Sequence, residues 1–214
     1  MTVRPITPRP PMLQALLGGR KTQDRTVLKP QPDRERNWTS VGCPEFRTAI
    51  FRDAHGWRQD VPLPCAPGDL LWVRENCATW EGKRRDAVYC ADLTDDEWRD
   101  IAHDICNGAP WKRRPSIHMP RWASRLTLRV TDVRVQRVQD ISEADTEAEG
   151  VDRWGLATWK NYTSDGTTHV VLNCRHSFST LWNSIHGPDA WSRNDWVEAR
   201  TFDVIRANVD QVQP

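Results

Sequence analysis

The sequence predicts an α+β fold built on a small mixed β-barrel with flanking helices. About seven short segments have the composition of strands, and three or four others have helical spacing of apolar residues. Gly- and Pro-rich turns separate these segments, which favours many short elements over a helical bundle or a doubly wound sheet. The 214 residues are enough to bury a core without disulfides.

The first half of the chain is predicted to hold mainly short strands. A short strand is predicted over residues 3–8. Its prolines place it at a sheet edge, since proline donates no ladder hydrogen bond. Leucines share one face of a helix over 11–17, which Gly18-Gly19 ends. A loop is expected over 29–47. Further strands are predicted at 48–53, 57–64, 70–76 and 87–92.

The second half carries clearer helix signals. Thr94 is a candidate cap for a helix from Asp95 to about Cys106. Ser142 and Asp145 resemble a capping box before a short acidic helix that stops at Gly150. The remaining expected elements are a basic loop at 112–125, strands at 125–140 and 195–207, and a helix at 175–187.

Composition limits the function. The 30 basic and 29 acidic residues exclude a globally basic nucleic-acid binder, although a local basic patch is still allowed. No window approaches 18 consecutive apolar residues, so no transmembrane helix is predicted. The N-terminus lacks the apolar region of a signal peptide, which favours the cytoplasm. Six cysteines without a C-x-x-C pair give no metal site, and we expect no cofactor.

Residues 19–25 (GRKTQDR) are the strongest local candidate for a site. Glycine allows a ligand to approach the backbone closely. Lys21 can hold a phosphate or, if it is desolvated, act as a base or nucleophile. The alternative is a solvated basic turn.

This motif resembles the signature of the ASCH family, a branch of the PUA-like barrels: Gly, any, Lys, any, any, Glu, any, Arg. Gly19 and Lys21 match, Asp24 stands at the Glu position, and Arg25 comes one residue early, with Thr26 in the expected place. Five further segments resemble the larger ASCH proteins often encoded by phages, namely 67–75, 115–130, 141–151, the LWNSIHG helix end and the DWVEARTFDVI strand.

The resemblance implies one domain over residues 1–207, with insertions at about 30–60 and 152–175, and a disordered tail at 208–214. It also implies a cleft that is lined by the lysine motif and binds RNA, DNA or a nucleoside. A small bacterial relative removes the acetyl group of N4-acetylcytidine with a Lys, a Thr and a Glu.

That relative's lysine and glutamate map to Lys21 and Glu149, while its threonine falls at Asp24. Thr22 is the other hydroxyl near the motif. We therefore expect Lys21 and Glu149 to converge in an apolar cleft, with Asp24 and Thr22 as further catalytic candidates. The alternative is a structural ion pair.

A basic stripe is the second candidate region, because cations contact phosphates and an aromatic ring can stack on a base. It comprises Lys112, Arg113, Arg114, His118, Arg121, Trp122 and Arg125. The alternative is that Trp122 is buried and the arginines pair with carboxylates. The residues expected to contact the ligand are Arg20, Arg25, Arg74, Arg113, Arg114, His118, Arg121, Trp122 and Arg125.

The leading hypothesis is a module that binds nucleic acid or a modified nucleoside around Lys21, without a membrane partner. One alternative is a hydrolase, either an amidohydrolase on an N4-acylated cytidine or a ribonuclease. Another is a phage structural accessory that kept the fold. A phage-encoded chain would act in the cytoplasm of its bacterial host.

Overall fold

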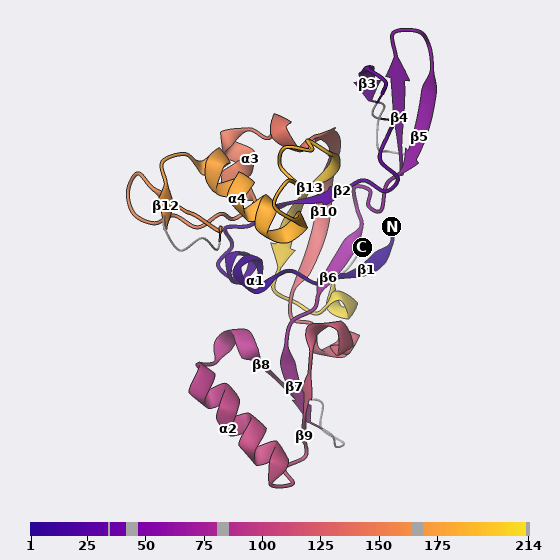
Figure 1. Ribbon diagram of the computed structural model, residues 1–214. Helices are drawn as coiled ribbons and strands as arrows, with labels where there is room; N and C mark the ends of the chain where they lie inside the picture. The colour runs from indigo at the N-terminus through magenta and orange to yellow at the C-terminus, as the bar shows by residue number, and fades with distance from the viewer. Residues whose placement is uncertain (34, 42–46, 81–85, 164–168, 213–214) are drawn as a thin grey trace. The chain divides into compact units, whose positions relative to one another are not determined.

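A computed structural model describes residues 1–33, 35–41, 47–80, 86–163 and 169–212. This part of the chain contains four α-helices and thirteen strands, which confirms the predicted α+β class (Figure 1). The strand orders described are linear, so the small barrel stays a prediction. The chain divides into two compact units, and each is described by itself.

Unit 1 comprises residues 1–17, 68–129 and 203–214. In its larger sheet, β6 (Leu70–Val73) pairs in parallel with β1 (Val3–Ile6), and on its other side it is antiparallel to the start of β10 (Thr127–Arg137). Helix α1 (Pro10–Leu17) buries Leu13 and Leu16, as its spacing predicted.

A second sheet of unit 1 has three strands in the order β8-β7-β9. The sequence predicted β8 but neither β7, at the centre of this sheet, nor β9, at its other edge. These strands are β7 (Cys77–Trp80), β8 (Ala87–Tyr89) and β9 (Trp111–Arg114). The predicted basic loop at 112–125 therefore begins inside a strand. Short 3-10 turns follow at Ser116–His118 and Arg121–Ala123.

Helix α2 (Asp95–Cys106) belongs to unit 1 and begins where the sequence predicted. Thr94 accepts from the Glu97 backbone, and the Glu97 carboxylate accepts from the Thr94 backbone, which completes a capping box. Beyond β13, a further 3-10 turn, η6 (Val209–Gln211), buries Val209. The sequence predicted a disordered tail at 208–214, whereas residues 209–211 form this turn. The last two residues of that predicted tail lie outside the described part.

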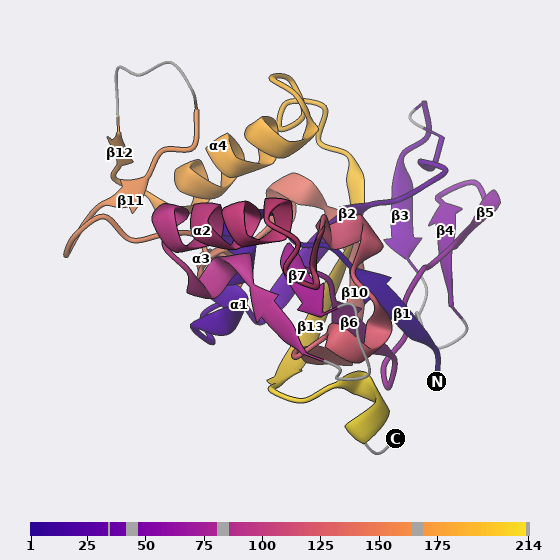
Figure 2. The same ribbon diagram turned by 90° about the horizontal axis from the view of Figure 1, so that it is seen from below.

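Unit 2 comprises residues 18–67 and 130–202. Strand β13 (Trp196–Ile205) lies between β10 and β2 (Gln23–Val27), and it is antiparallel to β2. Helix α3 (Glu143–Ala148) begins after Ser142, the predicted cap, and α4 (Cys174–His186) buries Phe178 and Leu181. A two-residue pair, β11 (Trp159–Lys160) and β12 (Val170–Val171), lies beside α4, as Figures 1 and 2 both show.

The predicted strands at 48–53 and 57–64 are confirmed as β4 (Thr48–Asp53) and β5 (Arg58–Pro62), which pair antiparallel as a hairpin. A third strand, β3 (Trp38–Val41), pairs with β4 inside the segment predicted as a loop. Residues 34 and 42–46 of the first predicted insertion, and 164–168 of the second, lie outside the described part. No helix in the described ranges has the length and apolar character needed to span a membrane.

Candidate functional site

The backbone around Lys21 is fixed on both sides. Gly19, at a φ of 70°, turns the chain after α1, a conformation that favours glycine. The Thr22 N–H donates to the Ala148 carbonyl, and the Thr22 carbonyl accepts from the Phe202 N–H. Side chains then alternate along the extended backbone, so that Lys21 is buried and Thr22 is exposed.

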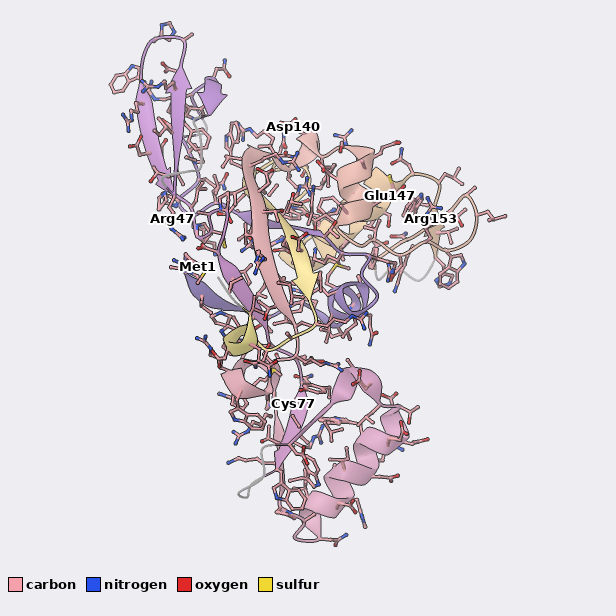
Figure 3. All side chains as sticks on the ribbon, turned by 180° about the vertical axis from the view of Figure 1, so that it is seen from behind. Met1, Arg47, Cys77, Asp140, Glu147 and Arg153 are labelled. Atoms are coloured by element: carbon pink, nitrogen blue, oxygen red, sulfur yellow. The ribbon has the colours of Figure 1, made fainter. Side chains whose placement is uncertain are left out.

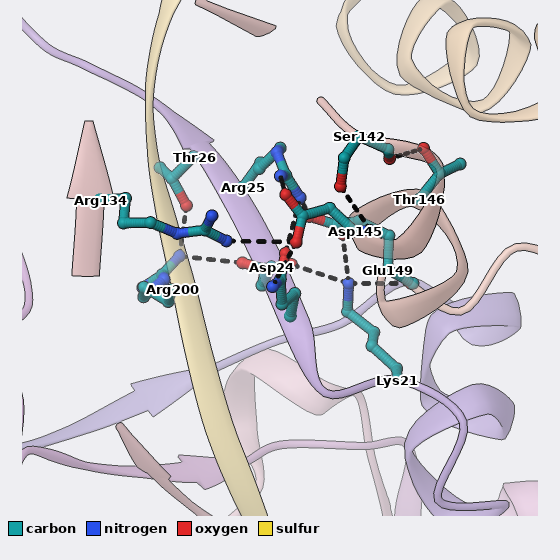
Figure 4. Close-up of polar contacts among 11 residues, drawn as sticks. Lys21, Asp24, Arg25, Thr26, Arg134, Ser142, Asp145, Thr146, Glu149 and Arg200 are labelled. Carbon is teal, nitrogen blue, oxygen red and sulfur yellow. Dashed lines mark hydrogen bonds and ion pairs between the residues drawn. The ribbon is translucent and has the colours of Figure 1, made fainter. Parts of the chain in front are cut away.

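The expected meeting of Lys21 and Glu149 is present. The Lys21 Nζ donates to Glu149 Oε2 at 2.7 Å and to the Glu149 carbonyl at 3.2 Å, and Asp24 Oδ1 lies 3.2 Å away (Figure 4). Glu149 directly follows the last turn of α3, which places its carboxylate over β2. Only 4% of the Lys21 side chain and 5% of the Glu149 side chain are exposed, so the pair is enclosed.

Arg25 completes this cluster from an inward position of β2, two residues after the buried Gln23. Its Nη1 donates to Glu149 Oε1 at 2.8 Å, and its Nη2 contacts Asp145 Oδ2 at 3.2 Å. The Arg25 side chain has no exposed surface. Arg25 is therefore enclosed among carboxylates rather than presented to a ligand. Sequence reasoning identified Asp145 only through its helix cap.

Asp24 is held from the opposite strand. Residues 24 and 200 are direct partners in the β2–β13 register, and Arg200 Nη2 donates to Asp24 Oδ2 at 2.9 Å. Arg200 also donates to Thr26 Oγ1 and lies 3.2 Å from the Cys65 sulfur. Sequence reasoning missed Arg200, because only the strand register reveals this pair of opposite charges.

These contacts favour the charged forms of Lys21 and Asp24. Burial alone would lower the pKa of Lys21, but attraction and hydrogen bonds from Glu149 and Asp24 outweigh it and raise that pKa above its ordinary value. Burial likewise opposes ionisation of Asp24, yet Lys21 and Arg200 lower its pKa. Lys21 is thus a fixed ammonium that can stabilise negative charge, not a neutral base.

A cavity of about 540 Å³ lies beside this cluster in unit 2. Trp159 and Val151 supply apolar lining, and Arg20, Glu147, Asp152 and Arg153 supply charges. These charges are paired: Arg20 contacts Asp152 at 3.0 Å, and Arg153 contacts Glu147 at 3.4 Å. Figure 3 labels Glu147 and Arg153, which lie close together in this region.

Two arginines of the basic stripe, Arg121 and Arg125, follow the alternative in which arginines pair with acids. Arg125 makes two hydrogen bonds to the buried Glu75 and also contacts Asp92. Arg121 contacts Asp210 at 2.6 Å. Trp122 is half-buried and packs against a small core of Cys77, Met119 and Ala123.

Four further predicted contact residues also lie in unit 1, and three of them belong to the same stripe. Arg74 donates to the Thr7 hydroxyl and the Ile117 carbonyl. His118 is exposed in a 3-10 turn. Arg113 and Arg114 are on β9, where Arg113 is exposed and Arg114 is half-buried.

Comparisons of the chain with protein-family models, curated proteins and solved structures give no match. Within the described ranges, no three His, Cys, Asp or Glu side chains are grouped as a metal site would require.

Proposed function

We propose that the protein binds a modified nucleoside or a base of a nucleic acid in the cavity beside the Lys21 motif. The observation that carries this proposal is the lining, in which the half-buried Trp159 indole lies among side chains that donate and accept hydrogen bonds. Aromatic side chains stack on unpaired bases, and polar groups then read the base edge. The volume of about 540 Å³ falls in the usual range for small-molecule sites.

The pairing of the lining charges favours a neutral base over a free phosphate. Arg20 and Arg153 each face a carboxylate, and Lys160 Nζ lies 3.6 Å from Asp152. An anion would have to displace these carboxylates from their cations. A neutral base requires no such exchange and can bond to both donors and acceptors.

In this proposal, Lys21 and Glu149 are positioning residues. Glu149 lies between two segments of the cavity wall, 147–148 and 151–153. Its carboxylate is held by Lys21 on one oxygen and by Arg25 on the other. The buried ion pairs therefore fix the wall that faces the ligand.

The hydrolase alternative receives less support. It needs a group free to activate water, whereas Lys21 is charged and both carboxylate oxygens of Glu149 accept from cations. Thr22 is exposed on the side of the backbone opposite the buried Lys21. Binding requires no free base and is the simpler function for this arrangement.

We also propose that the protein is a phage-encoded member of the ASCH family with a PUA-like barrel. We further propose that it acts in the cytoplasm. The described thiols support this location, because Cys65, Cys77, Cys90 and Cys174 form no disulfide. Burial raises the pKa of Cys77 to about 11, which is typical of an unreactive thiol.

Calorimetric titration with cytidine, N4-acetylcytidine and the other common nucleosides tests the proposal. Trp159→Ala should weaken binding by roughly 5- to 150-fold, the cost of losing one stacked base. Trp154→Ala is the matched control, because Trp154 is 59% exposed and is not a lining residue. Equal affinity of wild type and Trp159→Ala, or no binding by wild type, would overturn the proposal. So would a hydrolysis product, detected by mass spectrometry, that Lys21→Ala does not form.

A further inference from the structure

A second cavity, of about 350 Å³, lies in unit 1 at the end of strand β9. It is lined by Asn76, Trp98, Arg113, Arg114 and Pro115. None of these lining residues carries a carboxylate. The Lys21 motif belongs to unit 2, so this cavity is a separate site.

The polar groups around this cavity are hydrogen-bond donors. Arg113 and Arg114 contribute guanidinium groups, which have no acceptor. Asn76 Oδ1 already accepts from the Ser116 N–H at 2.8 Å, so the Asn76 amide has its N–H₂ group left to donate. A lining made of donors fits an anion, and a planar guanidinium fits a phosphate best.

The Arg114 Nε already donates to the Thr79 hydroxyl at 2.8 Å, so the charge that matters here is that of Arg113. Arg113 and its exposed neighbour Lys112 form no ion pair in the ranges that the structure describes, whereas Arg121 and Arg125 do. On the nearby helix α2, the carboxylate of Glu97 is occupied by its cap at Thr94, and Asp96 contacts Arg99 at 2.6 Å. The two cations on β9 are therefore available to an incoming anion.

An aromatic ring supports one of these two cations, Arg113. The Arg113 guanidinium carbon lies 4.9 Å from the centre of the Trp98 ring, so the indole supports one face of the cation. Trp80 and Trp111 pair edge to face, with ring centres 5.2 Å apart, at the other end of the β7–β9 pairing. Trp98 and Pro115 add apolar surface next to the donors.

We infer that this cavity binds a phosphate group of single-stranded nucleic acid. Arg113, Arg114 and the Asn76 amide donate to the phosphate oxygens, and the adjoining base contacts Trp98 and Pro115. Such a combination of cations and an aromatic surface is typical of single-strand recognition. This inference takes only its class of ligand, nucleic acid, from the proposed function. Its site is independent of that function, because the residues of this cavity lie in unit 1 and not in unit 2.

The test is fluorescence anisotropy with a labelled ten-nucleotide oligothymidine at several salt concentrations. Arg113→Ala should raise Kd by about tenfold and reduce the slope of log Kd against log salt by about 1, as expected for one lost phosphate contact. Arg113→Lys should bind with intermediate affinity, since it keeps the charge and loses the planar donors. The control is Arg121→Ala, which removes an exposed arginine already paired with Asp210 and should bind like wild type.

Competition separates the possible sources of the phosphate. Unlabelled oligothymidine should displace the probe at far lower concentration than inorganic phosphate or thymidine monophosphate. Equal competition per phosphate would overturn the claim that a strand is bound, and an unchanged Kd in Arg113→Ala would overturn the site. Nucleoside titration of the same samples tests the unit 2 cavity separately: if wild type binds the oligonucleotide and no nucleoside, the proposed function fails and this inference stands.

Discussion

Replacing Glu149 with glutamine removes one negative charge and almost no volume, so it tests whether the buried cluster holds unit 2 together. The carboxylate accepts from Lys21 at 2.7 Å and from Arg25 at 2.8 Å. Both cations are almost completely enclosed, so water cannot replace the lost charge. Glutamine can still accept one hydrogen bond, but its N–H₂ group would face a cation.

The expected loss in the free energy of unfolding is about 3 kcal/mol. Breaking a buried ion pair by removing one partner typically costs about 3–5 kcal/mol, because the remaining charge is left without compensation. The lower end applies here, since Asp24 still contacts Lys21 at 3.2 Å and Asp145 still contacts Arg25 at 3.2 Å.

Urea unfolding measures this loss. With a slope of about 1–3 kcal/mol per molar urea, a loss of about 3 kcal/mol lowers the midpoint by at least about 1 M. Glu147→Gln is the matched control on the same helix. Its carboxylate is 52% exposed and contacts Arg153 at 3.4 Å, and such surface pairs contribute only about 0–1 kcal/mol.

A loss below about 1 kcal/mol for Glu149→Gln would refute the reasoning. It would mean that the charges around Lys21 are well solvated and that the cluster does not fix the cavity wall. A loss in Glu147→Gln as large as in Glu149→Gln would refute it as well, since burial would then not decide the cost.

Two further predictions concern pH. The pKa values of Asp24 and Asp145 lie below their ordinary value of 3.8 despite the opposing effect of burial, because Lys21 and Arg200 attract Asp24 while Gln23 and Arg134 bind Asp145. Their stabilising contribution is present above pH 3.8 and is lost as the pH falls through the lower folded-state values. Urea midpoints should therefore not fall between pH 7 and pH 5 and should drop below pH 3.8, and a drop already complete at pH 5 would contradict this. The pKa of Glu198 is shifted in the opposite direction. Burial raises it above 4.5 despite the attraction of Arg200, so ionisation of Glu198 opposes folding as the pH rises. Glu198→Gln should therefore be more stable than wild type at pH 7, with the gain disappearing below pH 4.5, and a less stable variant at pH 7 would disprove the assignment.

Local signals in the sequence predicted the capped helices well. The Thr94 capping box joins residues three apart, and the Ser142 hydroxyl accepts from the Asp145 N–H at 3.0 Å. Such contacts form within one turn, so composition and spacing are enough to find them. The predicted starts of α2 and α3 are accordingly confirmed.

Strands that depend on distant partners were not predicted. Strand β9 has the sequence WKRR, whose consecutive cations show no alternation of apolar and polar residues. It forms because it pairs with β7, where Trp80 lies opposite Trp111. Pairing across more than thirty residues leaves no pattern inside either segment.

The site shows the same limit. Lys21 and Glu149 are 128 residues apart, and only the family resemblance suggested that they meet. The partners of Arg25 and Asp24 depend on the β2–β13 register and on where α3 ends, which no local pattern encodes. Likewise, no local sequence pattern around Arg121 identifies Asp210 as its ion-pair partner, and none around Arg125 identifies Glu75.

The segmentation of the two units has a consequence during synthesis. Unit 2 has all its residues once residue 202 is made, whereas unit 1 needs residues 203–214 as well. Residues 1–17 are therefore made before unit 2 and wait through 18–202, roughly 10–40 s at about 5–20 residues per second. Unit 1 is thus completed after unit 2, by the segment in which Asn208 donates to the carbonyls of Arg121 and Ser124.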